Sequence, residues 1–245
     1  MTFLTAPLYH GYTALDLVIV ALAVLVMPVL SILNGRKLAR EAPDARKLVP
    51  RYIAIIVRGL LFAAVVIGAW WVQGRPFGAL GLAPHLGIWD YAGFTLALLI
   101  GLGMVAQSFR LASAPDEKLA QAMKAVHSIK ITPNTRRELA LFMAMSLSAG
   151  FWEELVYRGF LIWFLMPLAG FAGAVVISAL IFGLAHLYQG IRGFLTSAVL
   201  GLVFAALYLL SASLWWLMAV HAVIDIAGGI TTFRIKRVAA RRAVA

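Results

Sequence analysis

The stretch FWEELVYRG, residues Phe151 to Gly159, places two adjacent carboxylates and an arginine inside an apolar segment long enough to cross a bilayer. An ionised carboxylate at the bilayer centre costs roughly 2.5–3.5 kcal/mol on insertion scales. Glu154 and Arg158 are four residues apart, so on a helix they share a face and can form an ion pair. Glu153 lies about 100° away around the helix and lacks that partner. The sequence therefore predicts one tethered carboxylate and one that is available for chemistry.

The composition indicates a polytopic membrane protein. Of the 245 residues, 63% are hydrophobic and only 13% are charged, which is more apolar side chain than a soluble fold needs. The net charge of +11 could suggest a nucleic-acid partner. The basic residues, however, gather between the apolar segments, as they do in the cytoplasmic loops of membrane proteins. We therefore expect a lipid bilayer as the surroundings and no nucleic-acid partner. The absence of cysteine excludes a thiol nucleophile.

We expect an all-α protein, a single integral-membrane domain over residues 1–245 with about seven transmembrane helices. The expected spans cover residues 14–33, 52–72, 91–109, 139–166, 171–188, 194–210 and 214–233. Basic residues concentrate in alternate loops and in the tail, which predicts an external N-terminus and a cytoplasmic C-terminus. The N-terminal residues do not resemble a cleaved signal peptide. We expect the inner or plasma membrane of a bacterium as the location.

One loop segment, from Pro115 to Ile131, has the pattern of an amphipathic helix. Four apolar residues fall on one face, and acidic residues at its start suit a helix N-terminus. The four apolar residues are Leu119, Met123, Val126 and Ile129. This pattern predicts an interfacial helix on the inner leaflet, which either connects two spans or guides substrate.

Few ionisable residues lie within the expected spans. They are Asp16, Arg58, Glu153, Glu154, Arg158, His186, His221 and Asp225. Asp16 and Arg58 lie near span ends, where a charged group reaches water easily, and this position favours a structural role. The other six come from the fourth, fifth and seventh spans, which predicts one site between three helices.

At this point the residues resemble a known family. EELVYR, FGLAH and HAVID are similar to the motifs EExxxR, FxxxH and HxxxN/D of the CPBP family, also called Abi or type II CAAX-processing proteases. The resemblance covers residues 139–230, the motif-bearing catalytic core, and the three motifs occur in the family's order. It implies a glutamic intramembrane endopeptidase that uses a water molecule activated by a glutamate.

The resemblance also implies a role for each matching residue. Glu153 would be the general base, and His186 would hold or polarise the water. His221 and Asp225 would stabilise the oxyanion of the tetrahedral intermediate. Supporting roles would fall to three further residues: Glu154 and Arg158, which would orient Glu153 or bind a substrate carboxylate, and Phe182, which would pack beside the site. No cofactor or metal is implied.

Two features of the pattern need an explanation from the fold. Many relatives have Asn where this chain has Asp225, and an ionised Asp cannot donate a hydrogen bond to an oxyanion. Asp225 is then either protonated or an acceptor that orients His221. Glu153 also lies deep in its span, whereas His186 lies near the inner surface. We expect the helix before Glu153, from Glu138 to about Met145, to extend into the cytoplasm.

Two alternatives remain open. His186, His221 and a carboxylate could bind zinc with an open position, although the sequence has no HExxH motif. Intramembrane Glu, His and Arg also occur in proton-coupled transporters, and an immunity or scaffold protein would need no catalysis. For a protease, the expected substrate is a membrane-anchored peptide or protein, either prenylated or carrying a C-terminal sorting segment.

Overall fold

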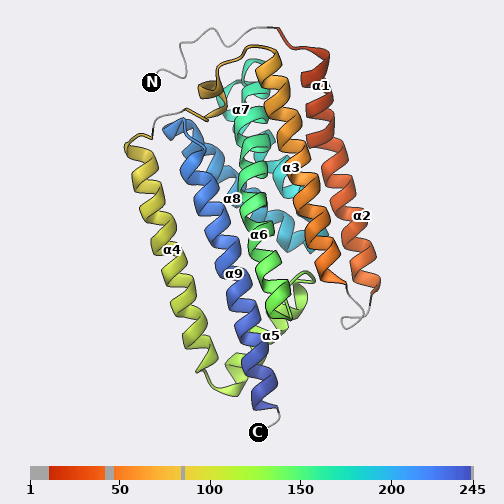
Figure 1. The fold of residues 1–245 in the computed structure, drawn as a ribbon, viewed down its shortest axis with the longest axis vertical. Coiled ribbons are helices and arrows are strands. Elements are labelled where there is room, and N and C mark those ends of the chain that lie inside the picture. Colours follow the sequence, from red (N-terminus) through yellow and green to blue (C-terminus); the bar gives the residue numbers. More distant parts are fainter. Residues whose placement is uncertain (1–10, 42–46, 84–85, 244–245) are drawn as a thin grey trace.

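The computed structural model describes residues 11–41, 47–83 and 86–243, and these residues form helices and no strand (Figure 1). The all-α prediction is therefore confirmed. The longer helices are α1 (Ala14–Ala21), α2 (Met27–Arg40), α3 (Leu48–Val72), α4 (Ile88–Ala112), α5 (Asp116–Ser128), α6 (Arg136–Glu153), α7 (Ile162–Ala185), α8 (Ile191–Ser211) and α9 (Trp215–Arg242). Two π-helical stretches, η2 (Leu22–Val26) and η5 (Glu154–Leu161), and two 3₁₀ turns, η4 (Phe77–Leu80) and η6 (Leu187–Gln189), join them.

Six helical stretches of the described chain are long and apolar enough to cross a membrane. One of them, Arg136–Ala185, has 50 residues, about 75 Å of helix and more than twice the hydrocarbon thickness of a bilayer. This stretch contains a non-helical residue, Gly170. If this stretch crosses the membrane twice, the number of membrane passes is the expected seven. The protein is an integral membrane protein.

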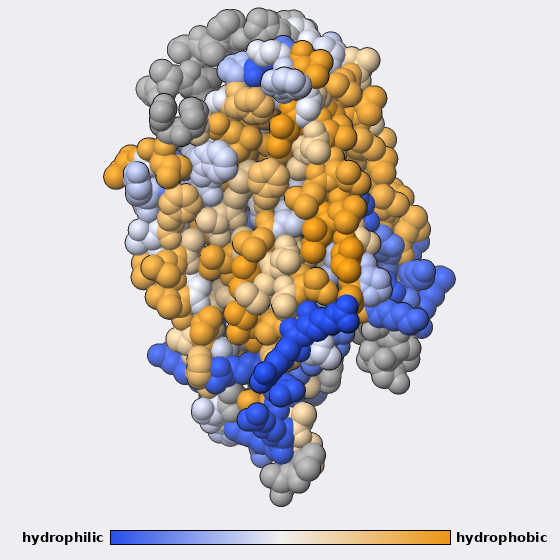
Figure 2. All heavy atoms as spheres, viewed as in Figure 1, coloured by the Kyte–Doolittle hydropathy of each residue, from blue (hydrophilic) through white to orange (hydrophobic). Residues whose placement is uncertain are grey.

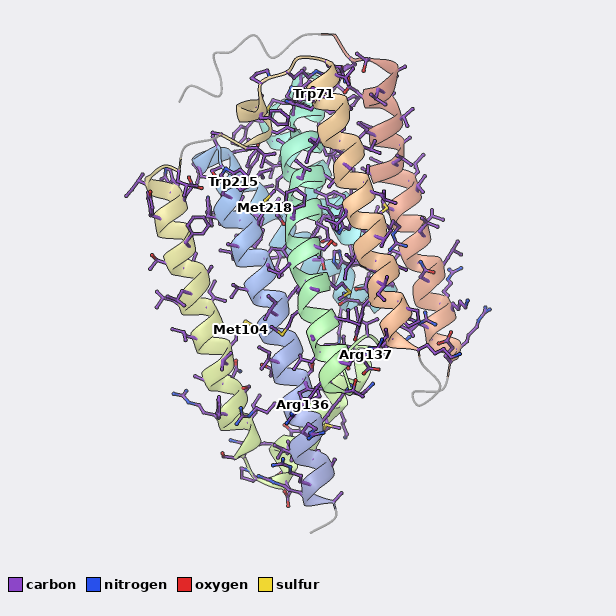
Figure 3. The ribbon with its side chains drawn as sticks, viewed as in Figure 1. Trp71, Met104, Arg136, Arg137, Trp215 and Met218 are labelled. Atoms are coloured by element: carbon purple, nitrogen blue, oxygen red, sulfur yellow. The ribbon has the colours of Figure 1, made fainter. Side chains whose placement is uncertain are left out.

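The surface of the bundle has an apolar middle and one strongly basic end. Figure 2 shows hydrophobic side chains over most of the visible face and hydrophilic ones gathered towards the end where α9 finishes. Arg136 and Arg137 lie towards that end, whereas Trp71 and Trp215 lie towards the other (Figure 3). Trp71 is 72% exposed, as expected of an aromatic side chain at a membrane interface. The orientation of this basic end towards the cytoplasm remains a prediction.

The helix predicted over 115–131 is present as α5, but its apolar face is covered by protein. Leu119 and Val126 are buried in a small core with Ile235, which belongs to the last turns of α9. Ile129 lies beyond the end of the helix and is 41% exposed, so its predicted place on this face is wrong. The last expected span ended at Phe233, whereas α9 continues to Arg242, and this extension covers α5.

Glu153 and His186 lie at the same level along the bundle axis because the chain reverses its direction at Gly170. Gly170 has φ 66° and ψ −178°, a conformation that favours glycine and breaks the helix. Glu153 lies 17 residues before it and His186 lies 16 residues after it. At 1.5 Å per residue both are about 25 Å from the reversal. The apparent difference in depth between them therefore disappears, because α6 is long: Thr135 and Glu138 form a capping box at its start.

A close approach of α6 and α9 brings the third motif, HAVID, to the level of Glu153. A Cβ atom at Gly150 would lie 2.7 Å from the Met218 carbonyl oxygen and 3.0 Å from the Ala222 nitrogen. Only glycine allows the two backbones to meet here, as small residues do at many membrane helix contacts. Gly150 precedes Glu153 by three residues, and His221 lies between Met218 and Ala222. The contact therefore sets His221 beside Glu153.

A second buried charge lies at the other end of the bundle. Asp16 is fully buried, and both of its carboxylate oxygens accept hydrogen bonds from Arg75, each at 2.7 Å. The Arg75 guanidinium lies 4.4 Å from the ring centre of Trp163. The expectation that Asp16 reaches water at its span end is therefore wrong. The reason is an ion pair across 59 positions of sequence, which helix spacing could not reveal.

Candidate active site

The polar residues of the three motifs meet in the interior of the bundle. Glu153 ends α6 and Glu154 begins η5, His186 follows the last residue of α7, and His221 and Asp225 come from α9. Every distance of 4.0 Å or less between an acidic oxygen and an imidazole nitrogen in the described chain lies within this group. The predicted convergence of three helices is therefore present in the structure.

Glu153 is the carboxylate without a tether. Its Oε2 atom lies 3.8 Å from Nε2 of His221 and 4.0 Å from Nε2 of His186. Both distances are too long for a direct hydrogen bond. The same oxygen is buried and has no hydrogen-bond partner in the protein. A water molecule or a polar group of a substrate would supply the missing partner.

Glu154 is the tethered carboxylate, as its spacing from Arg158 predicts. Its Oε1 accepts from Nη1 of Arg158 at 3.0 Å and from Nδ1 of His221 at 2.7 Å. Both Glu154 and Arg158 are buried, and the Arg158 guanidinium also lies 4.2 Å from the ring centre of Phe182. Glu154 therefore fixes the orientation of the His221 ring, while Phe182 packs against the cation that balances Glu154.

The hydrogen bonds of the two imidazoles define what their other nitrogens can do. Nδ1 of His186 lies 2.9 Å from the Phe182 carbonyl oxygen, which can only accept, so Nδ1 carries the proton. In the neutral ring Nε2 of His186 is then an acceptor, and it faces Glu153. Nδ1 of His221 donates to Glu154 by the same argument, which leaves Nε2 of His221 directed at Glu153.

Asp225 makes a weaker contact. Its Oδ2 lies 3.7 Å from Nε2 of His221, and its side chain is 40% exposed. The acceptor that orients His221 in this structure is Glu154 and not Asp225. Asp225 therefore lies at the margin of the site, near the imidazole nitrogen that faces Glu153.

The helix changes its winding directly after Glu153. Residues Glu154–Leu161 form a π-helix, and all eight are buried. Ser178 of α7 donates a 2.6 Å hydrogen bond to the Tyr157 carbonyl within this stretch. π-Helical turns occur often at functional sites, because they shift side chains relative to a regular helix. The sequence contains no pattern that predicted this change of winding.

A cavity of about 180 Å³, partly open to its surroundings, reaches the site from between α2 and α3. Glu153, Tyr157 and His186 lie on its wall, and so does Arg58 of α3. Arg58 is half-buried, ten residues after the start of its helix. Arg58 therefore lies on the wall of the cavity beside the site, a position that its spacing in the sequence did not predict, and its depth in the membrane stays a prediction. The sequence signal was present, since a charge in an apolar helix marks a functional candidate.

A metal ion would need at least three converging ligands. Within the described ranges, no group of three His, Asp or Glu side chains is arranged closely enough to hold one. The donor types nevertheless suit zinc, because both imidazoles present Nε2 towards a carboxylate while Nδ1 is held by an acceptor.

Comparison with known proteins agrees with this arrangement. Residues 135–227 match the family described as type II CAAX prenyl endopeptidase, Rce1-like. No curated protein and no solved structure matches the chain. The matched region contains all three motifs, from EELVYR to HAVID, and is nearly the same as the expected core of 139–230. The motif-bearing region of this chain, residues 135–227, is therefore similar to the Rce1-like type II CAAX prenyl endopeptidase family.

Proposed function

We propose that this protein is an intramembrane endopeptidase in which Glu153 activates a water molecule to hydrolyse a peptide bond. The observation that carries the proposal is the pair of adjacent glutamates in opposite settings. Oε1 of Glu154 accepts from Arg158 and His221, whereas the Glu153 carboxylate accepts no hydrogen bond from the described residues and its Oε2 faces two imidazoles. The match of residues 135–227 to the family supports a membrane protease, and this geometry supports Glu153 as its base.

In the first step, water attacks the carbonyl carbon of the scissile peptide bond. Glu153 takes a proton from the water as the new C–O bond forms, and Nε2 of His186 accepts the hydrogen bond of the water's other proton. The carbonyl oxygen becomes an oxyanion. His221 stabilises it through Nε2 in the doubly protonated ring, whose positive charge is balanced by Glu154 at Nδ1.

In the second step, the tetrahedral intermediate collapses. The C–N bond breaks, the oxyanion returns to a carbonyl group, and Glu153 gives its proton to the leaving nitrogen. The carboxylate is thereby regenerated, and no redox change occurs. Asp225, in its protonated form, would add a second donor near the oxyanion, which is the role that its position in the HxxxN/D motif implies.

The substrate is a membrane-anchored peptide or protein. Its scissile bond would enter the cavity between α2 and α3, whose wall contains Glu153 and His186. A prenylated protein or a C-terminal sorting segment fits this requirement, because each presents a short peptide next to an apolar anchor.

The test compares the termini of membrane proteins by mass spectrometry in cells that carry wild type, Glu153→Ala or Arg110→Gln. Arg110 is an exposed residue of α4 and serves as the matched control. We expect specific new termini with wild type and with Arg110→Gln, and none with Glu153→Ala. Identical profiles in all three strains, with a growth phenotype that still depends on the gene, would favour a transporter or a binding protein instead.

A zinc-dependent protease is the second candidate function. It is favoured by the two Nε2 atoms that face Glu153 while both Nδ1 atoms are held by acceptors. Purified protein would be assayed with 1,10-phenanthroline and then with added zinc. Activity that resists the chelator supports the metal-free mechanism, and activity that is lost and then restored by zinc supports this alternative.

A further inference from the structure

Arg58 is a cation without an acidic partner in a membrane-spanning helix. Across the described residues 11–41, 47–83 and 86–243, no carboxylate lies within 4.0 Å of it. Arg51, two turns before Arg58 on the same cavity wall, is paired with Glu41. A charge inside the membrane-spanning region is costly unless a partner or a function retains it. Arg58 also lies outside residues 135–227, so the match to the family assigns it no role.

The cavity that Arg58 lines collects polar atoms that the protein leaves without hydrogen bonds. Three of them are donors and come from three residues: Nε of Arg58, Nε1 of Trp152 and the hydroxyl group of Tyr157. The fourth is Oε2 of Glu153, the proposed base. Trp152 lies directly beside α3, because a Cβ atom at Gly59 would overlap its indole ring. The residue next to Gly59 is Arg58, so two of the donors belong to the same helix contact.

The chemistry of these groups selects one class of ligand. Buried donors without partners need an acceptor, and a permanent cation needs an anion. A carboxylate supplies both, because its two oxygens accept several hydrogen bonds and suit a guanidinium group. The rest of the cavity wall is largely apolar and includes Met27, Leu38 and Ile55, which would hold aliphatic side chains of a peptide.

We propose that Arg58, with Trp152 and Tyr157, binds a carboxylate of the peptide substrate in the cavity and thereby selects acidic or free C-terminal peptides for cleavage at Glu153. This inference rests on the proposed function. The carboxylate can come from the C-terminus of the substrate or from an Asp or Glu side chain, and the experiment separates these two sources.

The experiment uses full-length protein in lipid nanodiscs and a pooled library of ten-residue peptides. Three versions of the library are prepared. The first has free C-terminal carboxylates, the second has C-terminal amides, and in the third every Asp and Glu is replaced by Asn and Gln. Cleavage is followed by mass spectrometry, and kcat/KM is compared between the libraries for wild type, Arg58→Gln, Arg58→Lys, Glu153→Gln and the control Arg110→Gln.

We expect wild type and Arg110→Gln to prefer one carboxylate-bearing library over its neutral counterpart by at least about tenfold, the effect of hydrogen bonds to a charged group. In Arg58→Gln this preference should fall to about one through a higher KM, with kcat on the neutral peptides unchanged. Arg58→Lys should retain part of the preference. If the preference that Arg58→Gln loses is that for free C-termini over C-terminal amides, the carboxylate is the C-terminus of the substrate. If it is that for Asp and Glu over Asn and Gln, the carboxylate is a side chain.

Five results would overturn the inference. Wild type that cleaves all libraries equally, or a preference that survives Arg58→Gln, would contradict the carboxylate site while the proposed function stands. Arg58→Gln protein that loses cleavage of neutral peptides as well would show that Arg58 supports the fold. Cleavage that persists in Glu153→Gln, or the absence of cleavage by wild type, would contradict the proposed function itself and this inference with it.

Discussion

Two buried carboxylates at different levels of the bundle have opposite surroundings. Asp16 accepts two hydrogen bonds from Arg75 and further ones from the backbone nitrogen and the hydroxyl of Thr13. Glu153, by contrast, has a buried oxygen without any protein partner, although two imidazoles and a cavity lie next to it. The hydrogen bonds of Asp16 are therefore satisfied within the protein, whereas Glu153 can still accept a hydrogen bond from another molecule.

The comparison shows that burial of a charge does not by itself distinguish structure from function. A fully bonded pair stabilises one conformation, whereas a partly bonded carboxylate in a cavity can bind and change protonation during a reaction. The adjacent residues Glu153 and Glu154 repeat part of this contrast within a single turn. Oε1 of Glu154 accepts from Arg158 and His221, while Oε2 of each glutamate is buried without a hydrogen-bond partner in the protein. Four variants test it, in order of the size of their expected effects.

Glu153→Gln should have the largest effect on activity and almost none on stability. The amide keeps the size of the side chain but cannot accept the proton of the water, so we expect the cleavage rate to fall by about 10³–10⁴-fold, near the upper range for loss of a general base. The rate would be measured on peptides with protein in nanodiscs, and the unfolding temperature by thermal denaturation. A large fall in unfolding temperature would show that Glu153 is structural like Asp16.

Glu154→Gln should impair both stability and activity. The change leaves the buried Arg158 without its counter-charge, which costs about 3–5 kcal/mol when one partner of a buried pair is removed. It also weakens the contact that orients His221, and loss of such an orienting group typically lowers activity by about 10–100-fold. Wild-type stability with full activity in this variant would contradict the assignment of Glu154 as the tether.

Asp16→Asn should affect stability alone. Arg75 would lose its carboxylate partner while the site around Glu153 stays intact, so we expect a loss of about 3 kcal/mol and unchanged cleavage per folded molecule. The double variant Asp16→Asn with Arg75→Met removes the stranded cation and should recover much of that stability. A fall in kcat of Asp16→Asn at a temperature where this variant is fully folded would show that the Asp16–Arg75 pair affects the site around Glu153. It would contradict a purely structural role for Asp16.

Much of the fold could be predicted from the sequence, because its signals are local. Apolar runs of about twenty residues and alternating basic loops follow from the bilayer itself. The pairing of Glu154 with Arg158 and the shared face of His221 and Asp225 follow from helical spacing. Each of these features depends on residues four positions apart or on a single segment.

The parts that could not be predicted depend on contacts between distant segments. Asp16 meets Arg75 across 59 residues, and His221 meets Glu154 across 67. The charge of Arg58 in an apolar helix is a local signal, but its place on the cavity wall depends on residues of other segments, among them Trp152 and His186. The π-helix after Glu153 depends in part on Ser178 of another helix, which satisfies a backbone carbonyl within it.

Asp225→Asn should have the smallest effect, and it tests the role of the residue at the last position of the HxxxN/D motif. Asp225 makes no direct hydrogen bond to His221, and its side chain is 40% exposed, so the exchange should leave the ring orientation intact. If Asp225 donates to the oxyanion, activity at neutral pH should stay within about threefold, because an amide donates in place of a protonated carboxyl.

The pH profile provides the decisive measurement for that variant. A carboxyl group donates only while it is protonated, so the wild-type rate should fall as pH rises, whereas the amide donates at every pH and the active range should extend to higher pH. Asp225→Ala, which has no donor, is the matched control and should lose about 10²-fold, the usual effect of removing one oxyanion donor. Loss of activity in Asp225→Asn with an unchanged unfolding temperature would contradict the donor role. Asp225 would then act through its charge on His221. It would be a third kind of carboxylate at the margin of the site, neither bonded like Asp16 nor available for proton transfer like Glu153.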